Sequence, residues 1–477
     1  MNILIFSTFH LPPHFLGLNL EFIQRNIDQG KTVYLIDCQG SFSECGFNPY
    51  KLKYMCEICK YRENHGLKYI NGNVNRLSLD NIITDQDREI ADNFLKDIKI
   101  IKKKLIYANF EVGEAVFSPY ISKTRDREFV SESDQAILKK LSLNSIITYE
   151  SIKRFITENN IDKITLFNGR WNLYRAALSA ARLSKIEVEI FENYKAGGYH
   201  ENFGENLPHN INNKIRLIEE HWSKNNNQED KLKVAADFYA KKRNGDTLID
   251  KSYTKDQIKG KLPDGFDNSK KTYVLFNSSD DEFAAVGSEF DNPFFTDQLE
   301  GILYLKEYFR DHPELQLIIR MHPNLKGLIK EYLIPLYAIE NKYPNIILIK
   351  PEDDTDTYEL MDIADTVISF GSTAGLEASY WGKPVILLGK CFYFYAEVSY
   401  IPNSRNEIAL LLETDLKPID SLNTKKFAYY FETGGSKSKY YLNKSNGNIY
   451  FKNHLLNKLP YWFKIYYKAL KYFNVKN

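Results

Sequence analysis

Residues 364–389 read ADTVISFGSTAGLEASYWGKPVILLG, an order of residue types that predicts a strand, a turn, a helix, a turn and a second strand. The apolar, β-branched run Thr366–Phe370 is typical of a buried parallel strand, and Val385–Leu388 repeats that pattern. Gly371 allows a sharp turn, and Ser372 can cap the helix that follows. Such a unit points the N–H groups of the helix start out of the carboxyl edge of a parallel sheet, which is a natural phosphate site.

The turn at the start of this helix can either cap the helix only or take part in a ligand site. Most such turns in α/β proteins only cap a helix. A capping box after Ser372 would place Glu or Gln at position 375, but Gly375 stands there. We therefore expect Glu377 to be free to face a ligand, for example ribose hydroxyls, and Ser372 and Thr373 to face a phosphate.

A second motif lies upstream, where residues 315–324 read LQLIIRMHPN. This pattern predicts a strand that ends in Arg320 and His322, because Pro323 stops the strand and keeps the residue before it extended. A lone histidine is usually structural. Here a cation and an imidazole at a strand end lie near a Gly-Ser-Thr helix start in one predicted sheet, and this pairing favours an anion site.

The two motifs together, Arg-x-His-Pro and Phe-Gly-Ser-Thr-x-Gly-x-Glu with a following Gly-x-Pro, resemble the carboxyl-terminal half of bacterial GT-B glycosyltransferases. The resemblance is greatest to proteins of capsule and surface polysaccharide biosynthesis, and it extends along nearly the whole chain. In related sialyl- and Kdo-transferases these motifs grip the phosphate of a CMP-sugar, and CDP-glycerol polymerases are similar. The resemblance implies an α/β fold of the GT-B type, with two Rossmann-like domains facing a cleft.

The resemblance also implies a donor site in the second domain. Its nucleotide-binding residues would be Arg320, His322, Ser278, Ser279, Ser372, Thr373 and Glu377. Ser278 and Ser279 begin the loop 278–282 after the predicted strand 272–277, and this loop approaches the donor phosphate or sugar in GT-B folds. The loop 350–354 lies where related enzymes hold the nucleotide base.

Length and charge limit the number of domains and the classes of function that we expect. A chain of 477 residues is too long for one core, so two or three domains are expected. The net charge of +1 provides no field that attracts nucleic acid, and no nucleic-acid-binding motif is present. The 33 Tyr and 30 Phe residues suit both sugar-stacking clefts and ordinary packing.

The amino terminus does not resemble a signal peptide. The apolar run Ile3–Phe6 is short, has no basic leader and is followed by Pro12 and Pro13. No apolar run approaches the length of a transmembrane helix. We therefore expect a cytoplasmic protein with reduced thiols, either free or peripheral on the inner face of the cytoplasmic membrane.

The first residues predict the opening of a Rossmann-like domain, with a strand at 2–7, a helix at 15–29 and a strand at 32–37. We expect this domain to span residues 1–255 and to carry a Cys-rich and helical insertion at about 38–150. The loop 8–14 lacks G-x-G-x-x-G, so a dinucleotide is not expected. In GT-B enzymes the corresponding loop faces the acceptor, so His10 and His14 are candidates for a base, or else ordinary loop histidines.

Four cysteines occur close together in this insertion, namely Cys38, Cys45, Cys56 and Cys59, and Cys391 is the only other one. Cys56 and Cys59 have the spacing of a zinc knuckle, and the other two can complete a tetrahedral site. We expect a structural zinc ion, with free thiols or a redox pair as the alternative. A catalytic metal is not expected, because four thiolates leave no open coordination position.

Polar residues follow two further predicted strands of the first domain. Asn168 and Arg170 come after the strand 164–167, and Glu192 comes after the strand 188–191. The capsule family has Asn-Gly-Arg and a Glu-Arg pair at these places, although Asn193 replaces the arginine here. Glu192 is the leading candidate for the general base, which must reach the acceptor hydroxyl, and an ordinary surface glutamate is the alternative.

The remaining boundaries follow from composition. The Lys- and Asp-rich stretch 251–271 reads as a linker, which gives a nucleotide-sugar domain at 256–425 and an aromatic, basic tail at 426–477. From Lys452 onward the tail has six lysines and no acidic residue. One helical face of the tail carries Trp462, Ile465, Tyr466, Ala469 and Phe473, and another carries Lys464, Lys468 and Lys471. This pattern predicts either a membrane-surface helix or a helix packed back on the first domain.

These features lead to one functional prediction and two alternatives. The prediction is a glycosyltransferase of capsule or surface polysaccharide biosynthesis that moves a sugar from a CMP-linked donor to a glycan or lipid-linked acceptor. Catalysis would need no metal or other cofactor and would use Glu192, His322 and His14. The alternatives are a CDP-polyol phosphotransferase and a non-catalytic assembly partner that keeps the GT-B fold.

Overall fold

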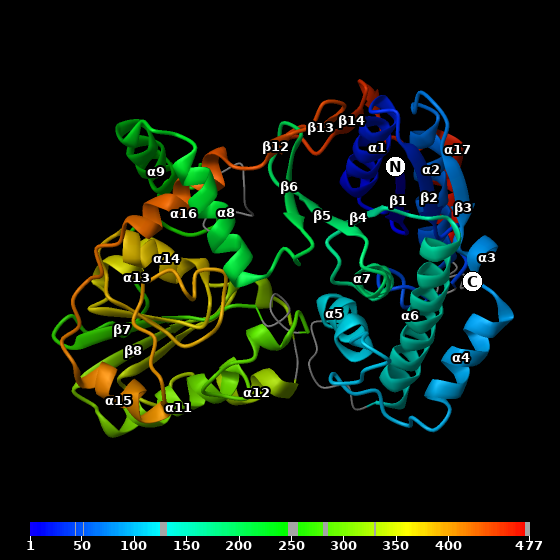
Figure 1. Ribbon diagram of the computed structural model, residues 1–477. Coiled ribbons are helices and arrows are strands. Elements are labelled where there is room, and N and C mark those ends of the chain that lie inside the picture. Colours follow the sequence, from blue (N-terminus) through cyan, green and yellow to red (C-terminus); the bar gives the residue numbers. More distant parts are fainter. Residues whose placement is uncertain are drawn as a thin grey trace. The chain divides into compact units, whose positions relative to one another are not determined.

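The computed structural model describes residues 1–42, 44–50, 52–124, 131–246, 256–279, 285–328 and 331–472. The chain forms two compact units, shown in Figure 1: unit 1 comprises Met1–Pro208 and Gly435–Asn477, and unit 2 comprises His209–Gly434. The domain boundaries expected at 255/256 and 425/426 are therefore wrong. The predicted linker lies within unit 2 where it is described, and its residues 251–255 lie outside the described residues.

Unit 1 is built on a seven-stranded sheet of order β12-β6-β5-β4-β1-β2-β3. The strands are β1 (Asn2–Ser7), β2 (Thr32–Asp37), β3 (Asn75–Ser78), β4 (Lys163–Phe167), β5 (Glu187–Asn193), β6 (Tyr199–Gly204) and β12 (Ser436–Lys437). The first five pair in parallel, whereas β6 and β12 are antiparallel. Strands β2 and β4 lie on the two sides of β1, so the strand order reverses between β1 and β4. Ligands of open α/β sheets bind at such a reversal.

Helices make up most of the segment between β2 and β4. They are α2 (Lys53–Leu67), α3 (Leu79–Ile82), α4 (Asp85–Leu95), α5 (Val112–Thr124) and α6 (Glu132–Glu158), and unit 1 also has α1 (Pro13–Asp28) and α7 (Asn172–Leu183). The helical character expected for 38–150 agrees with this. Strand β3 was not foreseen, because its short sequence Asn-Arg-Leu-Ser lies at the edge of the sheet and lacks a continuous apolar run.

The carboxyl-terminal segment returns to unit 1 and docks on α1. The carboxylate of Glu21, fully buried in α1, accepts backbone N–H bonds from Lys439 (2.8 Å), Tyr440 (2.7 Å) and Tyr441 (2.9 Å). The Tyr441 ring packs so closely over Gly17 that a Cβ atom at that glycine would lie 2.5 Å from it. After these contacts come β13 (Tyr441–Asn443), β14 (Ile449–Phe451), β15 (His454–Leu455) and α17 (Tyr461–Tyr472).

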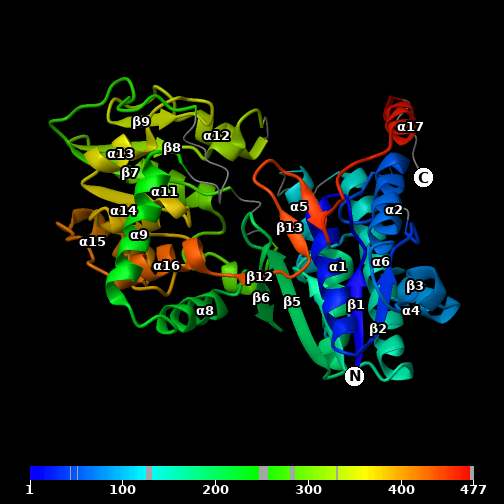
Figure 2. The ribbon, with the colours of Figure 1, turned by 90° about the horizontal axis from the view of Figure 1, so that it is seen from above.

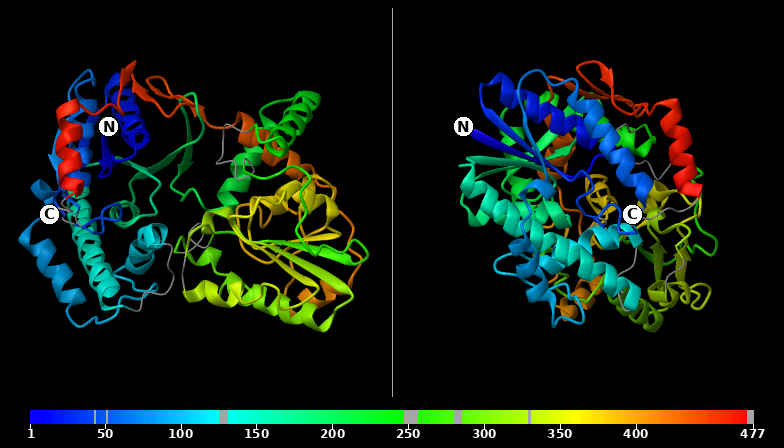
Figure 3. Two further views of the ribbon diagram at one scale, coloured as in Figure 1. Left: turned by 180° about the vertical axis from the view of Figure 1, so that it is seen from behind. Right: turned by 90° about the vertical axis from the view of Figure 1, so that its right-hand side faces the viewer.

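Unit 2 has a five-stranded parallel sheet of order β11-β10-β7-β8-β9, visible in Figures 2 and 3. Its strands are β7 (Lys271–Phe276), β8 (Leu315–Arg320), β9 (Ile346–Ile349), β10 (Thr366–Ser369) and β11 (Val385–Leu387). Its main helices are α8 (Ile211–Ser223), α9 (Gln228–Arg243), α11 (Gln298–Asp311), α12 (Ile334–Tyr337), α13 (Thr357–Ile363), α14 (Thr373–Tyr380), α15 (Arg405–Glu413) and α16 (Leu422–Thr433).

Both faces of this sheet are buried. Successive side chains of a strand point to opposite faces. In β7, Tyr273 and Leu275 join one hydrophobic cluster, and Val274 and Phe276 join the other. This arrangement explains why the strands read as continuous apolar runs.

The fold class is therefore α/β with two Rossmann-like units, as the sequence predicts. The cleft expected between the two units stays a prediction. In the part of the chain that the structure describes, no helix has both the length and the apolar character needed to cross a membrane.

Candidate functional site

The carboxyl edge of the unit 2 sheet has the geometry of a ligand site. Strand β7 lies between β10 and β8, and the chain passes through β8 and β9 before it returns to β10 and β11. The strand order therefore reverses between β7 and β10, and ligands of such sheets bind outside the carboxyl ends of the strands at this point. The loops that follow β7, β8 and β10 lie at this edge.

Hydrogen bonds hold these three loops together. The backbone N–H of His322, after β8, donates to Oδ1 of Asn277, after β7 (2.6 Å). The hydroxyl of Ser278 donates to the carbonyl of Phe370, after β10 (3.0 Å). The structure thus brings the predicted residues Ser278 and His322 to one edge with the start of α14. Asn277 had no expected role, since an asparagine after a strand is a common turn residue.

The start of α14 is shaped by close packing. Ser372 is its N-cap, and its hydroxyl accepts the N–H of Ala374 (3.3 Å). Thr373 is the exposed first residue of the helix. At Gly375 a Cβ atom would lie 2.6 Å from the Tyr393 hydroxyl, which itself donates to the carbonyl of Ser372 (2.6 Å). The Tyr393 hydroxyl occupies the space that a glutamate side chain at position 375 would need, and this explains why glycine stands there instead of the glutamate of a capping box.

The expectation that Glu377 is free to face a ligand is wrong. Its side chain is buried, and one carboxylate oxygen accepts the hydroxyl of Tyr358 (2.6 Å) while the other accepts the ammonium group of Lys242 (3.0 Å). Burial, together with the Glu377 carboxylate, raises the pKa of Tyr358. These partners come from α13 and α9, and no local pattern could have revealed them. A role for Glu377 in nucleotide binding stays a prediction.

The two basic residues of the Arg-x-His-Pro motif have different surroundings. Arg320 is buried and donates to the carbonyls of Lys350 (2.7 Å) and Asp353 (3.0 Å), so it braces the loop after β9. Burial lowers the pKa of Arg320. His322 is half-buried, and its Nδ1 accepts the N–H of Asn324 (3.1 Å). In the neutral ring this bond assigns the proton to Nε2, which makes Nε2 a hydrogen-bond donor.

This edge can stabilise an anion. It combines the backbone N–H groups of a helix start, the hydroxyl of Thr373 and the imidazole of His322. A helix amino terminus carries partial positive charge and N–H groups without a partner in the helix. A phosphate group is the ligand that such donors favour. Contact of Ser279 and Arg320 with that ligand stays a prediction.

In unit 1, the structure places the predicted bases His14 and Glu192 on different elements. His14 lies at the start of α1, edge-on to the Phe15 ring (4.2 Å between centroids), and burial lowers its pKa to about 4. Glu192 lies within β5 and not after it, because β5 continues to Asn193 and pairs with β6. The Glu192 carboxylate accepts a hydrogen bond from the Asn168 side chain, so the residues predicted after two strands do meet.

The four clustered cysteines line one pocket of unit 1, together with His10 and Glu63. Burial raises the pKa of Cys38 to about 11 and that of Cys45 to about 12. All four cysteines are among the described residues, and within those residues no group of three or more His, Cys, Asp or Glu side chains could hold a metal ion. The arrangement therefore does not support the structural zinc ion, which stays a prediction that zinc analysis of the purified protein can test.

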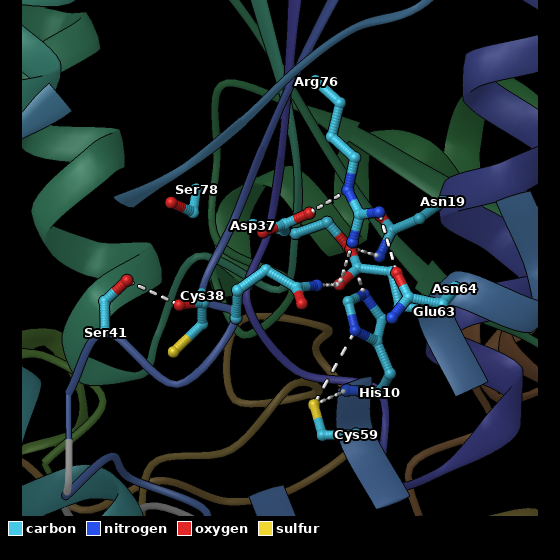
Figure 4. Close-up of polar contacts among 12 residues, drawn as sticks. His10, Asn19, Asp37, Cys38, Ser41, Cys59, Glu63, Asn64, Arg76 and Ser78 are labelled. Carbon is cyan, nitrogen blue, oxygen red and sulfur yellow. Dashed lines mark hydrogen bonds and ion pairs between the residues drawn. The ribbon is translucent and has the colours of Figure 1, made fainter. Parts of the chain in front are cut away.

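A buried polar network lies beside this pocket, and the sequence did not reveal it (Figure 4). Arg76 on β3 donates to Asp37 at the end of β2 (2.6 Å) and contacts Glu63 on α2 (3.4 Å). His10 lies 2.6 Å from the Ser7 hydroxyl and 3.6 Å from the Glu63 carboxylate. Burial lowers the pKa of His10 to about 3 and raises the pKa values of Asp37 and Glu63.

The unit 2 segment that carries the Arg-x-His-Pro and Gly-Ser-Thr motifs matches a known family. Residues 218–405 match the family described as capsule polysaccharide biosynthesis protein. The recognition of this family from the two motifs is thereby confirmed for that segment. No curated protein matches the chain in sequence.

Solved structures with a similar arrangement include two kinds of protein. The KpsC beta Kdo 2,4 transferase of Thermosulfurimonas dismutans is 16% identical, with 56% of this chain and 79% of that chain covered and a TM-score of 0.37. The UDP-GlcNAc 2-epimerase of Methanocaldococcus jannaschii is 12% identical, with 91% of this chain and 100% of that chain covered and a TM-score of 0.27.

Proposed function

We propose that this protein is a glycosyltransferase of capsule polysaccharide biosynthesis. It would transfer a sugar from a nucleotide-activated donor, most simply a CMP-sugar, to a glycan or lipid-linked acceptor. The observation that carries the proposal is the donor-rich edge of unit 2, where the loop after β7 bonds both the His322 loop and Phe370 ahead of α14, inside the segment that matches the capsule family. Fold alone would not support an activity, because one fold serves many functions.

The chemistry follows from where negative charge develops. When the bond between the sugar and the phosphate breaks, charge builds up on the leaving phosphate. Hydrogen bonds from the helix start and from His322 Nε2–H would strengthen in the transition state, which is the condition for catalysis. His322 is thus proposed to stabilise the leaving group. Ser372 and Thr373 are proposed to place the backbone N–H groups of the helix start against the leaving phosphate. No step requires a metal ion.

Activation of the acceptor is proposed to rest on unit 1. A general base must accept the proton of the acceptor hydroxyl as the new bond forms. Glu192 is the proposed base, and its hydrogen bond from Asn168 would hold the carboxylate in one orientation. His14 is the second candidate, since its lowered pKa keeps it neutral and able to accept a proton at pH 7.

The first experiment is a thermal-shift screen of the purified chain against CMP, CDP, UDP and GDP. Binding to the folded state alone raises stability by about 2.7 kcal/mol at a ligand concentration of 100 times Kd. We expect CMP to give the largest shift and His322→Ala to reduce it. Failure of all four nucleotides to bind would contradict the proposal and favour a non-catalytic assembly role.

The second experiment identifies the product with the nucleotide-sugar that binds. Transfer with a glycosidic linkage, unchanged by a chelator such as EDTA, is the expected result. A phosphodiester product would instead show a polyol phosphotransferase. Loss of transfer on chelation, recovered by added metal, would contradict the metal-independent mechanism.

A further inference from the structure

The last helix of the described chain, α17, packs on unit 1 with only one of its sides. Its buried or half-buried positions are Phe463, Tyr467 and Leu470, which are spaced four and three residues apart and so form one stripe. Phe463 packs against Tyr61 of α2 (5.0 Å between centroids), and Tyr467 packs edge-on against Tyr54 (5.1 Å). The views in Figures 1, 2 and 3 agree in placing α17 alongside α2.

The other sides of α17 expose large apolar and aromatic side chains. The exposed fractions are 79% for Tyr461, 63% for Trp462, 56% for Ile465 and 83% for Tyr472. None of these positions belongs to the stripe that contacts α2. The helix docks on the first unit, as one of the two alternatives predicts. Of the predicted apolar face, Trp462, Ile465, Tyr466 and Ala469 are exposed, and Phe473 lies outside the described residues.

The charged side chains of α17 itself have one sign. Lys464, Lys468 and Lys471 are exposed on α17, and Lys458 is exposed just before it. No acidic residue follows Glu432 in the sequence. Aromatic side chains with polar edges beside lysines match the interface of a membrane with anionic head groups.

We infer that α17 is a membrane-docking helix that lies in the plane of an anionic lipid surface. Its stripe of Phe463, Tyr467 and Leu470 anchors it to α2, Trp462 and Ile465 enter the boundary between head groups and acyl chains, and the lysines contact lipid phosphates. Helices of this kind bind through buried apolar area together with attraction to anionic lipids. The surface belongs to unit 1 alone and does not depend on the proposed reaction.

The test is cosedimentation of the full-length chain with vesicles of phosphatidylcholine, with and without phosphatidylglycerol. Each lysine near an anionic surface contributes about 1 kcal/mol to binding, which changes the partition coefficient about fivefold. The triple variant Lys464→Gln/Lys468→Gln/Lys471→Gln should therefore lower the partition coefficient about 150-fold. The matched control is Lys259→Gln/Lys342→Gln/Lys417→Gln, which removes the same charge from exposed lysines of unit 2 and should change it little. Salt at 0.5 M should release the wild-type chain, because it screens the attraction.

A second variant separates lipid insertion from folding. Trp462→Ala/Ile465→Ala removes apolar groups that do not contact α2, so we expect unchanged thermal unfolding and weaker vesicle binding. Phe463→Ala, in contrast, should loosen the helix itself. The inference is overturned if the wild-type chain ignores anionic vesicles or if the α17 triple variant binds as the control does. The variant Trp462→Ala/Ile465→Ala could also have a lower mass than the wild-type chain on ultracentrifugation and still bind vesicles equally well. That result would show that the face binds a second copy of the chain instead of a membrane.

Discussion

In unit 2 the groups at the carboxyl edge of the sheet are hydrogen-bond donors near solvent, among them the exposed Thr373 at a helix start and the half-buried His322. In unit 1 the corresponding edge buries its ionisable groups. His10 is 1% exposed and sits among Ser7, Glu63 and Cys59, and aromatic rings such as Phe15 and Phe167 (3.9 Å between centroids) pack nearby.

The difference shows that the same βαβ topology does not fix the chemistry of its edge. Burial penalises charged forms, so it lowers the pKa of His10 to about 3 and that of His14 to about 4. At the edge of unit 2 the buried cation Arg320 braces a loop through carbonyls, and the helix start carries the positive potential. We therefore expect unit 2 to bind the anion, and His10 and His14 at the edge of unit 1 to stay neutral.

The largest effect is expected for Glu192→Gln, which tests whether unit 1 supplies the base. General base catalysis contributes about 10²- to 10⁴-fold, so transfer should fall by that factor. Nucleotide binding should be unchanged, because Glu192 belongs to unit 1 and the proposed donor edge to unit 2. The control is Glu189→Gln, on the same strand but paired with Lys163 (3.1 Å). Equal rates for the two variants would exclude Glu192 as the base.

The next effect concerns the unit 2 edge, where His322→Ala removes one donor. A hydrogen bond to a charged group contributes roughly 1.5–3 kcal/mol, so turnover should slow by roughly 10- to 150-fold. His312→Ala is a suitable control, because that ring lies at the end of α11 and bonds the Tyr308 carbonyl (2.7 Å). Full activity of His322→Ala with the correct donor would show that the anion site is elsewhere.

Acidification should weaken unit 1 through His10. The pKa of His10 is about 3 in the folded chain and 6.5 as its ordinary value, so below pH 6.5 the unfolded chain takes up the proton and stability falls as pH falls. At pH 5 this loss is about 2 kcal/mol for His10 alone.

Hydrogen exchange of β1 and β2 peptides between pH 7 and pH 5, corrected for intrinsic rates, measures this loss. His10→Gln should flatten the dependence, whereas His454→Gln, at an exposed position of unit 1, should leave it unchanged. The same slope in wild type and His10→Gln would mean that His10 is not buried neutral.

The smallest effect is expected for Ser372→Ala, at the helix start of unit 2. Loss of an N-cap side chain costs about 1 kcal/mol, and the Ser372 hydroxyl accepts the N–H of Ala374. Faster hydrogen exchange in α14 with a smaller loss of turnover than His322→Ala would agree with a capping role. A larger loss of turnover than His322→Ala would instead make the Ser372 hydroxyl a direct phosphate ligand.

Local sequence was sufficient for several strands. The predicted bounds of β1 and β2 agree with the structure, because their apolar runs end there at polar residues. The placement of the His322 loop and the start of α14 at one edge, where both flank the loop after β7, was predictable as well. Parallel strands bring their carboxyl ends to one edge whatever the connections between them.

Other features depend on contacts between segments that are far apart in the chain, and only the tertiary structure decided them. Helices α8 and α9 belong to unit 2 because both pack on α16. Glu377 is occupied because Lys242 and Tyr358 reach it from α9 and α13, and the tail returns to unit 1 because Glu21 binds its backbone. Residue type and spacing describe what a side chain can bond, but its partner and its burial, and hence its pKa, are set by which distant elements pack against it.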